Sequence, residues 1–220
     1  MPSHIRTKVY AAPEVLAALL NSKGQVDLSM VIPHPPGLAD LGGDGISMAA
    51  EGVAKNACAI APHSNPMIAS LEMHNRSRDS ATKLPPADLE QAITMIRNYC
   101  ATGYLHGMDF QSDKWGTKWN AYSQQAGDAG CLIFETAWSA PLPVIAELSA
   151  QHRGQRIEVV YADEDIGANC GTVVYLNGEC VEKNVAPRWS DSDEDTRRRW
   201  REFALAVWGR TDDDEDEDEG

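Results

Sequence analysis

The stretch GCLIFETAWSAPLPVIAELSAQHRGQRIEVVYADE, residues 130–164, carries the clearest structural signal in the chain. Residues 130–138 are mostly apolar and are typical of a buried strand. Residues 139–154 have prolines near their start and apolar residues at helical spacing, which predicts a helix with one inward face. Apolar and polar residues then alternate over 155–164, as in a half-buried strand. The stretch therefore predicts a β-α-β unit.

The N-terminal residues predict a second unit of the same kind. Residues 4–11 alternate as a strand should, and 12–24 combine an early proline with an apolar helical stripe. Residues 26–33 read as a second strand that ends at a proline. Two split β-α-β units predict an α+β fold of the ferredoxin-like class, an antiparallel sheet with its helices on one face. Asn-Gly within residues 169–184 adds a strand hairpin.

A long insertion of about residues 37–113 separates the two units. Within it, 37–85 is rich in proline and glycine and predicts one or two helices set in irregular chain. Residues 85–103 predict a clear helix whose apolar face runs through Leu89 and Ile96. The insertion is thus expected to be helical and irregular, in contrast to the sheet around it.

The C-terminal part predicts one amphipathic helix followed by an acidic tail. We expect a ferredoxin-like domain over 1–184, a helix within 185–210, and the tail at 211–220. Because amphipathic stripes usually face a core, the helix should dock its aromatic side on the domain body. That side consists of Trp200, Phe203, Ala204, Val207 and Trp208.

The formal net charge of −14 is unevenly placed. The run DDDEDEDE, 212–219, holds eight of the 33 acidic residues and leaves 25 against 19 basic ones. A mildly acidic body weighs against free nucleic acid as the main partner, because phosphate binding normally needs a cationic surface. The tail favours a partner with a basic surface. The alternative is that the tail is only a solvated extension, as many blocks of like charge are.

The cysteines and the hydropathy pattern point to one kind of compartment. Five cysteines without a close Cys-x-x-Cys pair predict reduced thiols rather than a disulfide framework. No apolar run approaches the roughly 20 residues that cross a bilayer, and the first residues do not resemble a secretory signal. We therefore expect a cytoplasmic protein without a membrane partner.

The sequence DKWGTKWNAY, 113–122, concentrates aromatic and basic side chains. Its two tryptophans share a side in either a helix or a strand, and a third stands where a predicted strand ends. We expect an aromatic joint that anchors the insertion on the sheet. Alternatively, lysines beside stacking rings suit single-stranded nucleic acid, with the arginines of 197–201 as further contacts. The candidate binding residues, including four from the tail, are Trp115, Lys118, Trp119, Asn120, Trp138, Asp212, Asp213, Asp214 and Glu215.

Signatures of catalysis and metal binding are weak. Cys58, His63 and His74 could be imagined as ligands, but their spacing matches no zinc pattern. There is no phosphate loop, no nucleophile elbow and no Cys–His nucleophile motif. We expect no enzymatic activity, no metal and no cofactor. Nothing pairs the carboxylates nearest the sheet within one element: Glu135, Glu158, Asp163, Glu164 and Asp165.

Three segments carry a resemblance to a known family. They are VDLSMVIPHPP (26–36), WGTKWNAY (115–122), and FETAWSAPLPVIAELSAQ (134–151) with the strand that follows it. On these segments the chain resembles the Api92-like, or YubB-type, proteins of phages and plasmids, which have a ferredoxin-like domain. The resemblance implies this fold and a mobile-element setting, but no reaction. The long insertion and the C-terminal helix with its tail depart from the family pattern.

Taken together, these features predict a non-enzymatic accessory protein of a phage or related element, acting in the host cytoplasm. It would bind a host protein with a basic surface, such as a nucleic-acid-binding complex, through an acidic surface that imitates nucleic acid. An inhibitor of a host defence system, in the manner of anti-CRISPR proteins, fits this description by analogy. The second hypothesis is a single-stranded nucleic-acid-binding protein that uses the tryptophan and lysine segment.

Overall fold

The computed structural model describes residues 3–38, 41, 45–58, 84–127 and 130–211. The chain divides into two compact units. One unit is formed by residues 1–33 together with 114–220, and contains the sheet. The other is formed by residues 34–113 and is helical where it is described. Each unit has buried apolar clusters of its own, one around Trp200 in the first and one around Met95 in the second.

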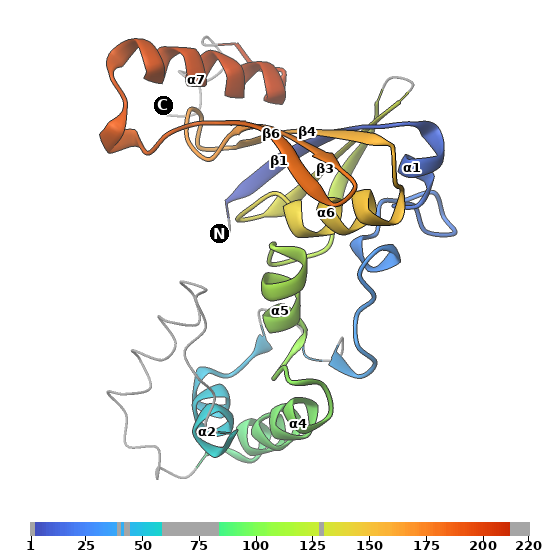
Figure 1. The fold of residues 1–220 in the computed structure, drawn as a ribbon. Helices are drawn as coiled ribbons and strands as arrows, with labels where there is room; N and C mark the ends of the chain where they lie inside the picture. The colour runs from blue at the N-terminus through green and yellow to red at the C-terminus, as the bar shows by residue number, and fades with distance from the viewer. Residues whose placement is uncertain (1–2, 39–40, 42–44, 59–83, 128–129, 212–220) are drawn as a thin grey trace. The chain divides into compact units, whose positions relative to one another are not determined.

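The first unit is built on one six-stranded antiparallel sheet with the strand order β2-β3-β1-β4-β5-β6 (Figure 1). The order of its first four strands, 2-3-1-4, is that of the ferredoxin-like fold, so the predicted fold class is confirmed. A hairpin of two further strands widens the sheet beyond β4. The strands are β1 (His4–Tyr10), β2 (Tyr122–Ala126), β3 (Cys131–Ala137), β4 (Arg156–Asp163), β5 (Gly171–Leu176) and β6 (Glu179–Val185).

The second strand of the first β-α-β unit is not where the sequence predicted it. Residues 26–33 form no strand; they contain a 3₁₀ turn at Leu28–Met30, and Val26 makes only an isolated bridge to Leu20. The Asp27 carboxylate caps that turn by accepting the Ser29 backbone N–H at 2.9 Å, which favours a turn over an extended strand. The missing strand is β2, which follows the insertion. The first crossover of the fold therefore contains the whole 34–113 unit.

The helix predicted over 12–24 is also shorter in the structure. Helix α1 covers only Pro13–Ala17. The side chain of Asn21 accepts the backbone N–H groups of Lys23 and Gln25, at 2.9 and 3.1 Å, and so forms a turn in place of further helix. Asparagine side chains compete with helical hydrogen bonds in this way, which explains the early end.

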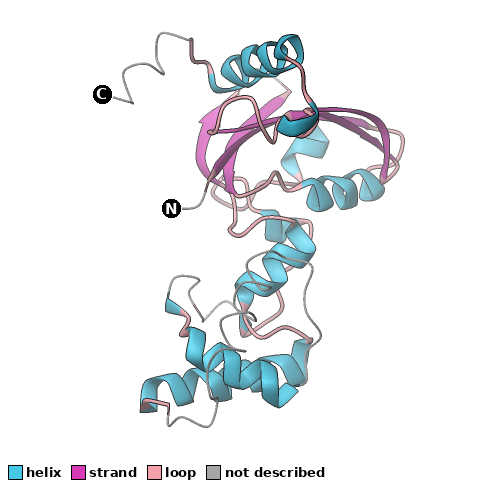
Figure 2. Cartoon of the chain, turned by 90° about the vertical axis from the view of Figure 1, so that its left-hand side faces the viewer, coloured by secondary structure: helices cyan, strands magenta, loops and turns pink. Residues whose placement is uncertain are grey.

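One face of the sheet is covered by α6 (Leu142–Gln151), as Figures 1 and 2 show. The prediction of a β-α-β unit at 130–164 is confirmed, because β3, α6 and β4 follow one another there. The apolar residues of the strands alternate toward this face. The core beneath α6 is fully buried and includes Ile5, Val9, Phe134, Ile145, Leu148, Ile157 and Val159.

The opposite face carries α7 (Glu194–Trp208), the predicted C-terminal helix (Figure 2). Asp193 caps it, since its carboxylate accepts the Thr196 N–H at 2.8 Å. The aromatic side of the helix packs against Ala162 of β4 and Cys170, as the sequence predicted.

All five cysteines are free thiols. Burial, and then the charge of Asp163, raise the pKa of the Cys170 thiol to about 11, so it stays protonated.

The far edge of the sheet is the hairpin β5–β6. Asn177 and Gly178 form its turn with φ values of 55° and 87°, which agrees with the Asn-Gly signal in the sequence. Strand β6 is largely exposed, and a bulge interrupts its pairing with β5 between Val174 and Tyr175. Bulges and charged residues on edge strands oppose pairing with other chains.

The described part of the 34–113 unit is helical. Its helices are α2 (Met48–Cys58), α4 (Pro86–Thr102) and α5 (Gly107–Phe110), and α2 packs on α4. Helix α4 confirms the prediction for 85–103, and Ile96 of its expected apolar face packs against the buried cluster around Met95. Leu89 is 49% exposed, whereas Ala92 and Met95 are buried. The first turn of the expected face is therefore exposed, while its later part meets the cluster. None of the described helices is both long and apolar enough to span a bilayer.

A cluster of ionisable side chains is buried inside the 34–113 unit. The Lys55 ammonium lies 2.6 Å from the Glu51 carboxylate, and these side chains are 7% and 2% exposed. The His106 ring, 1% exposed, lies with its Nε2 atom 3.7 Å from the same carboxylate. Burial alone would raise the pKa of Glu51, but the contacts with His106 and Lys55 lower it, so the carboxylate is charged. The pair therefore joins two compensating charges away from water.

We predict that Glu51→Gln lowers the free energy of unfolding of the helical unit by about 3–5 kcal/mol, because it leaves the Lys55 ammonium buried without a counter-charge. Adding Lys55→Met should recover most of this loss. Urea unfolding followed by far-ultraviolet circular dichroism measures both. Glu90→Gln on the exposed surface of α4 is the control. A double variant no more stable than Glu51→Gln would contradict the buried pair.

Candidate functional site

Trp115 lies where the chain returns from the insertion to the sheet. Its side chain is 2% exposed, and its indole N–H donates to the Ile32 carbonyl at 2.9 Å. Ile32 precedes the 34–113 unit and Trp115 follows it, so this bond joins the two ends of the insertion. A buried indole needs such an acceptor. In the described structure, Trp115 is part of the fold's interior rather than of a surface.

Residues 116–117 form a tight corner against the end of β3. Gly116 has φ of 75°, and a Cβ atom there would lie 2.8 Å from Cδ of Pro143. The Thr117 hydroxyl donates to the Ala137 carbonyl at 2.8 Å, and the Ser139 hydroxyl donates to the Gly116 carbonyl. The corner needs glycine for both its backbone conformation and its close approach to proline.

Gly116→Ala should lower the free energy of unfolding by about 2 kcal/mol or more, because the left-handed backbone and the contact with Pro143 add together. Gly154→Ala is a matched control. Its φ is 79°, but no atom lies within 4 Å of the added Cβ, so only the backbone cost of about 1 kcal/mol remains. Urea denaturation of the two variants gives the difference. Equal losses would show that the Pro143 contact does not matter.

The structure brings together Lys118, Trp119 and Trp138. The Lys118 Nζ atom lies 4.6 Å from the ring centroid of Trp119 and 4.9 Å from that of Trp138. Lys118 is only 9% exposed, and both tryptophans are half-buried. A cation between two indole faces is stabilised by their quadrupoles. Lys118 thus contacts the faces of both Trp119 and Trp138, whereas Trp115 donates its indole N–H to Ile32.

Trp138 itself adopts an unusual backbone conformation at the end of β3. Its φ is 72°, which is uncommon for a bulky residue. Its N–H donates to the Ser3 carbonyl at 2.9 Å, and its carbonyl accepts from the Asn169 amide at 3.3 Å. These bonds hold the residue so that its ring covers Lys118.

Asn120 faces the segment that precedes the insertion. Its side-chain oxygen accepts the Leu28 and Ala121 N–H groups, each at 2.9 Å, and its amide donates to Asp27 Oδ1 at 2.8 Å. Burial opposes ionisation of Asp27, but hydrogen bonds from Ser29 and Asn120 prevail and lower the pKa of the carboxyl. Asn120 thus supports the 27–28 turn.

The pKa of Asp27 is lower in the folded chain than its ordinary value of 3.8. The ionised carboxylate therefore adds to the free energy of unfolding at pH values above 3.8. That contribution disappears as the pH falls through the lower, folded value. We predict that Asp27→Asn loses less stability than the parent chain between pH 5 and pH 3, measured by urea unfolding. Asp165→Asn, at an exposed position, is the control. A parallel decrease for Asp27→Asn and the parent would contradict the assignment.

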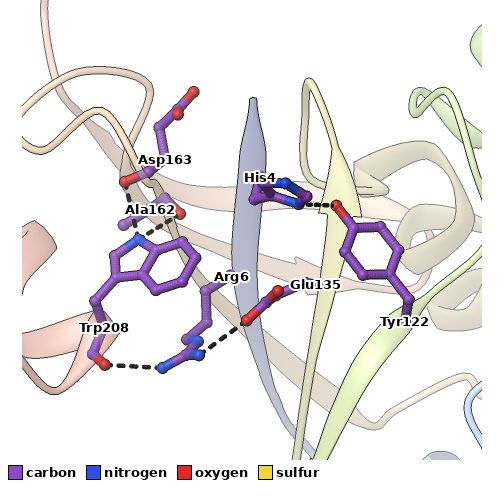
Figure 3. Close-up of polar contacts among 7 residues, drawn as sticks. All are labelled: His4, Arg6, Tyr122, Glu135, Ala162, Asp163 and Trp208. Carbon is purple, nitrogen blue, oxygen red and sulfur yellow. Dashed lines mark hydrogen bonds and ion pairs between the residues drawn. The ribbon is translucent and has the colours of Figure 1, made fainter. Parts of the chain in front are cut away.

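A row of polar side chains crosses the sheet face on which α7 packs (Figure 3). The Tyr122 hydroxyl and the His4 Nδ1 atom are 2.6 Å apart. Burial, and then the charges of Glu135 and Glu164, raise the pKa of Tyr122 to about 12. The hydroxyl therefore stays protonated, and it is hydrogen-bonded to the imidazole. Trp119 packs edge-on against the same tyrosine, which links the row to the lysine cluster.

The other end of this row fixes α7. Arg6 pairs with Glu135 at 2.8 Å and donates to the Trp208 carbonyl at 2.8 Å, with its guanidinium 4.3 Å from the indole centroid (Figure 3). The Trp208 N–H donates to the Ala162 and Asp163 carbonyls, at 3.2 and 2.9 Å. A cation at a helix C-terminus is favourable. His4, Arg6 and Tyr122 were not predicted as site residues, although the alternation in 4–11 places the first two on one face.

Most of the other candidates are engaged in the fold. Glu135 pairs with Arg6, Glu158 with an arginine of the same strand, Asp163 accepts the Asn169 amide at 3.0 Å, and Glu164 accepts the His4 N–H at 2.8 Å. In the described part of the chain no three potential ligands gather as a metal site. Cys58 ends α2. Outside the described residues lie His63, His74, Asp212, Asp213, Asp214 and Glu215.

The arginines of α7 are only partly available. Arg197 stacks on Trp189, 4.5 Å from its centroid, and donates to its carbonyl at 3.0 Å. Arg198 pairs with Asp195 at 2.7 Å, and Arg199 lies over Trp200. Trp189 is 58% exposed, more than any other tryptophan in the described structure. The basic surface of α7 is interleaved with acids, which weakens it as a phosphate track.

Comparison with family models agrees with the fold. Residues 114–203 match the model of a family described as the ferredoxin-like domain in Api92-like protein. Among solved structures, the protein api92 from Yersinia pseudotuberculosis matches at 11% sequence identity and a TM-score of 0.43, over 85% of this chain and 99% of that one. No curated protein matches the chain. The resemblance drawn from the tryptophan motifs is confirmed for this part of the chain.

Proposed function

Since the second half of the chain carries the ferredoxin-like domain of Api92-like proteins, we propose that the protein is a non-enzymatic accessory protein of a phage or related mobile element. It acts in the host cytoplasm by binding a macromolecular partner with a basic surface. The partner is a nucleic-acid-binding component of the host, and the consequence is inhibition of a defence system in the manner of anti-CRISPR proteins.

The observation that supports this proposal is the way α7 is fixed on the sheet. Trp200 and Trp208 are 5% and 8% exposed, and Arg6 holds the last turn of the helix from below. Residues 212–219, with eight acidic side chains, follow directly. The acidic run therefore begins four residues after the end of a helix that is fixed on the sheet. Concentrated charge of one sign speeds the encounter with a partner of the opposite sign and favours its orientation.

The alternative, single-stranded nucleic-acid binding, finds less support in the tryptophan segment. Trp115 is buried, Asn120 is bonded to the 27–28 turn, and Lys118 is enclosed by two indoles. These groups are therefore not arranged as a row of exposed rings along a basic groove. A site for nucleic acid would have to use Trp189 and Arg197 on α7 instead.

Affinity purification from host cells, followed by mass spectrometry, tests the proposal. Neutralising residues 212–219 by Asp→Asn and Glu→Gln changes should weaken capture of the partner about tenfold, and added salt should weaken it for the parent chain only. The neutralised chain keeps its length, so it is matched for size. Its thermal unfolding should be unchanged, which separates lost binding from lost folding.

Unchanged capture and unchanged salt dependence of the neutralised chain would remove the acidic-surface mechanism. A gel shift of short single-stranded oligonucleotides at low salt, lost on Arg197→Ala, would favour the alternative. The first hypothesis thus predicts that neutralising residues 212–219 weakens binding, whereas the second predicts that Arg197→Ala does.

A further inference from the structure

A polar cleft of about 800 Å³ runs beside β2, at the edge of the sheet. One wall is the 20–27 segment that follows α1. The other wall is β2 itself, with the start of β3 at its base. The volume lies within the range of ligand sites in proteins. All of the lining residues belong to the sheet-containing unit.

The outer edge of β2 has no strand beside it among the described residues. Its backbone ladder is made with β3, and no backbone-to-backbone hydrogen bond joins it to the 20–27 segment. Instead the Gln124 carboxamide bridges the two: its oxygen accepts the Val26 N–H at 2.7 Å, and its nitrogen donates to the Val26 carbonyl at 3.0 Å. The side chain thus makes the pair of bonds that a neighbouring strand would make.

This bridge also indicates the width of the gap. Neighbouring strands lie about 4.8 Å apart. A glutamine side chain together with a hydrogen bond is longer than that spacing, so Val26 stands farther from β2 than an adjacent strand would. This edge contains a β-bulge, in which Ser123 and Gln124 together oppose the single residue Phe134 of β3. Ser123 has φ of 46°, and bulges of this kind redirect side chains beside binding sites.

The unused polar groups of the cleft define its chemistry. The side chains of Gln25, Ser123 and Gln125 line it and make no hydrogen bond with any described residue. The hydrogen bonds of Asp27 all fall on Oδ1, and within the described structure Oδ2 makes none. Among the described lining residues there is no lysine or arginine, which disfavours phosphates and other anions. Amides and an open strand edge are complementary to the main chain of an extended peptide.

We infer that this cleft binds an extended peptide segment of a partner protein, which adds to β2 as a further strand. Gln124, whose side chain is exposed, moves aside and releases Val26 to the incoming main chain. The Asp27 carboxylate, the one charged side chain among the described residues that line the cleft, favours a peptide with a lysine or arginine. The site is separate from the acidic tail and does not depend on the function proposed above.

The test is a titration of the nitrogen-15-labelled full chain with the capped peptide Ac-TVTKVTV-NH2 at physiological salt. We expect saturable shifts of backbone amides in β2 and in residues 20–27, with a Kd of about 1 mM or tighter. Gln124→Ala, which removes the side chain that occupies the edge, should lower the Kd. Asp27→Asn should raise it about threefold for this peptide and leave it unchanged for the peptide with threonine in place of lysine.

The matched control is the same peptide with a fully N-methylated backbone, which keeps the side chains but donates no main-chain hydrogen bond. Equal binding of the methylated peptide would overturn the inference, as would shifts confined to β6 or α7. Absence of saturable shifts would overturn it too. Saturable shifts of the cleft residues with maltotriose, a neutral sugar, and none with the peptide would also overturn it. Glu182→Gln, on the opposite edge of the sheet, should leave the titration unchanged. Neutralising residues 212–219 should also leave it unchanged, which keeps this test independent of the tail.

Discussion

The hydrogen bond from the Trp115 indole to the Ile32 carbonyl closes the sheet-containing unit at the place where the 34–113 insertion interrupts it. It joins the two points at which the chain leaves the sheet-containing unit and returns to it. The bond between Asn120 and the Leu28 N–H supports the same pair of segments. Closing so long a loop costs conformational entropy, but the cost grows only with the logarithm of its length. A few buried contacts at the closure are therefore enough to keep β2 in register with β3.

The sequence predicted those elements whose pattern is local. The unit at 130–164, the Asn-Gly hairpin and the docking of α7 each follow from periodicity and from turn or cap residues close in sequence. Strand β2 was missed because YSQQA has no apolar alternation and contains a bulge. Residues 26–33 look like a strand, yet the Asp27 cap bends them into a turn. In both cases a side-chain hydrogen bond or a bulge prevailed over the hydrophobic pattern.

The candidate site was predictable only in part, for a related reason. The sequence marked Lys118, Trp119 and Trp138 as candidate binding residues, and the structure brings them together, but their arrangement depends on the left-handed backbone of Trp138, which the sequence does not signal. The pairing of His4 with Tyr122 and of Arg6 with Trp208 joins residues more than a hundred positions apart. Such contacts follow from the register of the sheet and from the packing of α7 on it. The aromatic segment consequently stabilises the fold, and the roles that we propose in recognition fall on the β2 edge and on the acidic run 212–219 instead.

The central position of β1 has a consequence for biosynthesis. This strand is made first, yet its partners are β3 and β4, and its Arg6 side chain contacts the last turn of α7. The N-terminal strand can therefore complete its pairing only after residues 131–163 have been synthesised, and its contact with α7 forms only after Trp208. Helices α2 and α4, by contrast, lie closer together in sequence and can associate earlier. Folding is thus expected to begin with the helices of the insertion and to end with the pairing of β1 in the sheet.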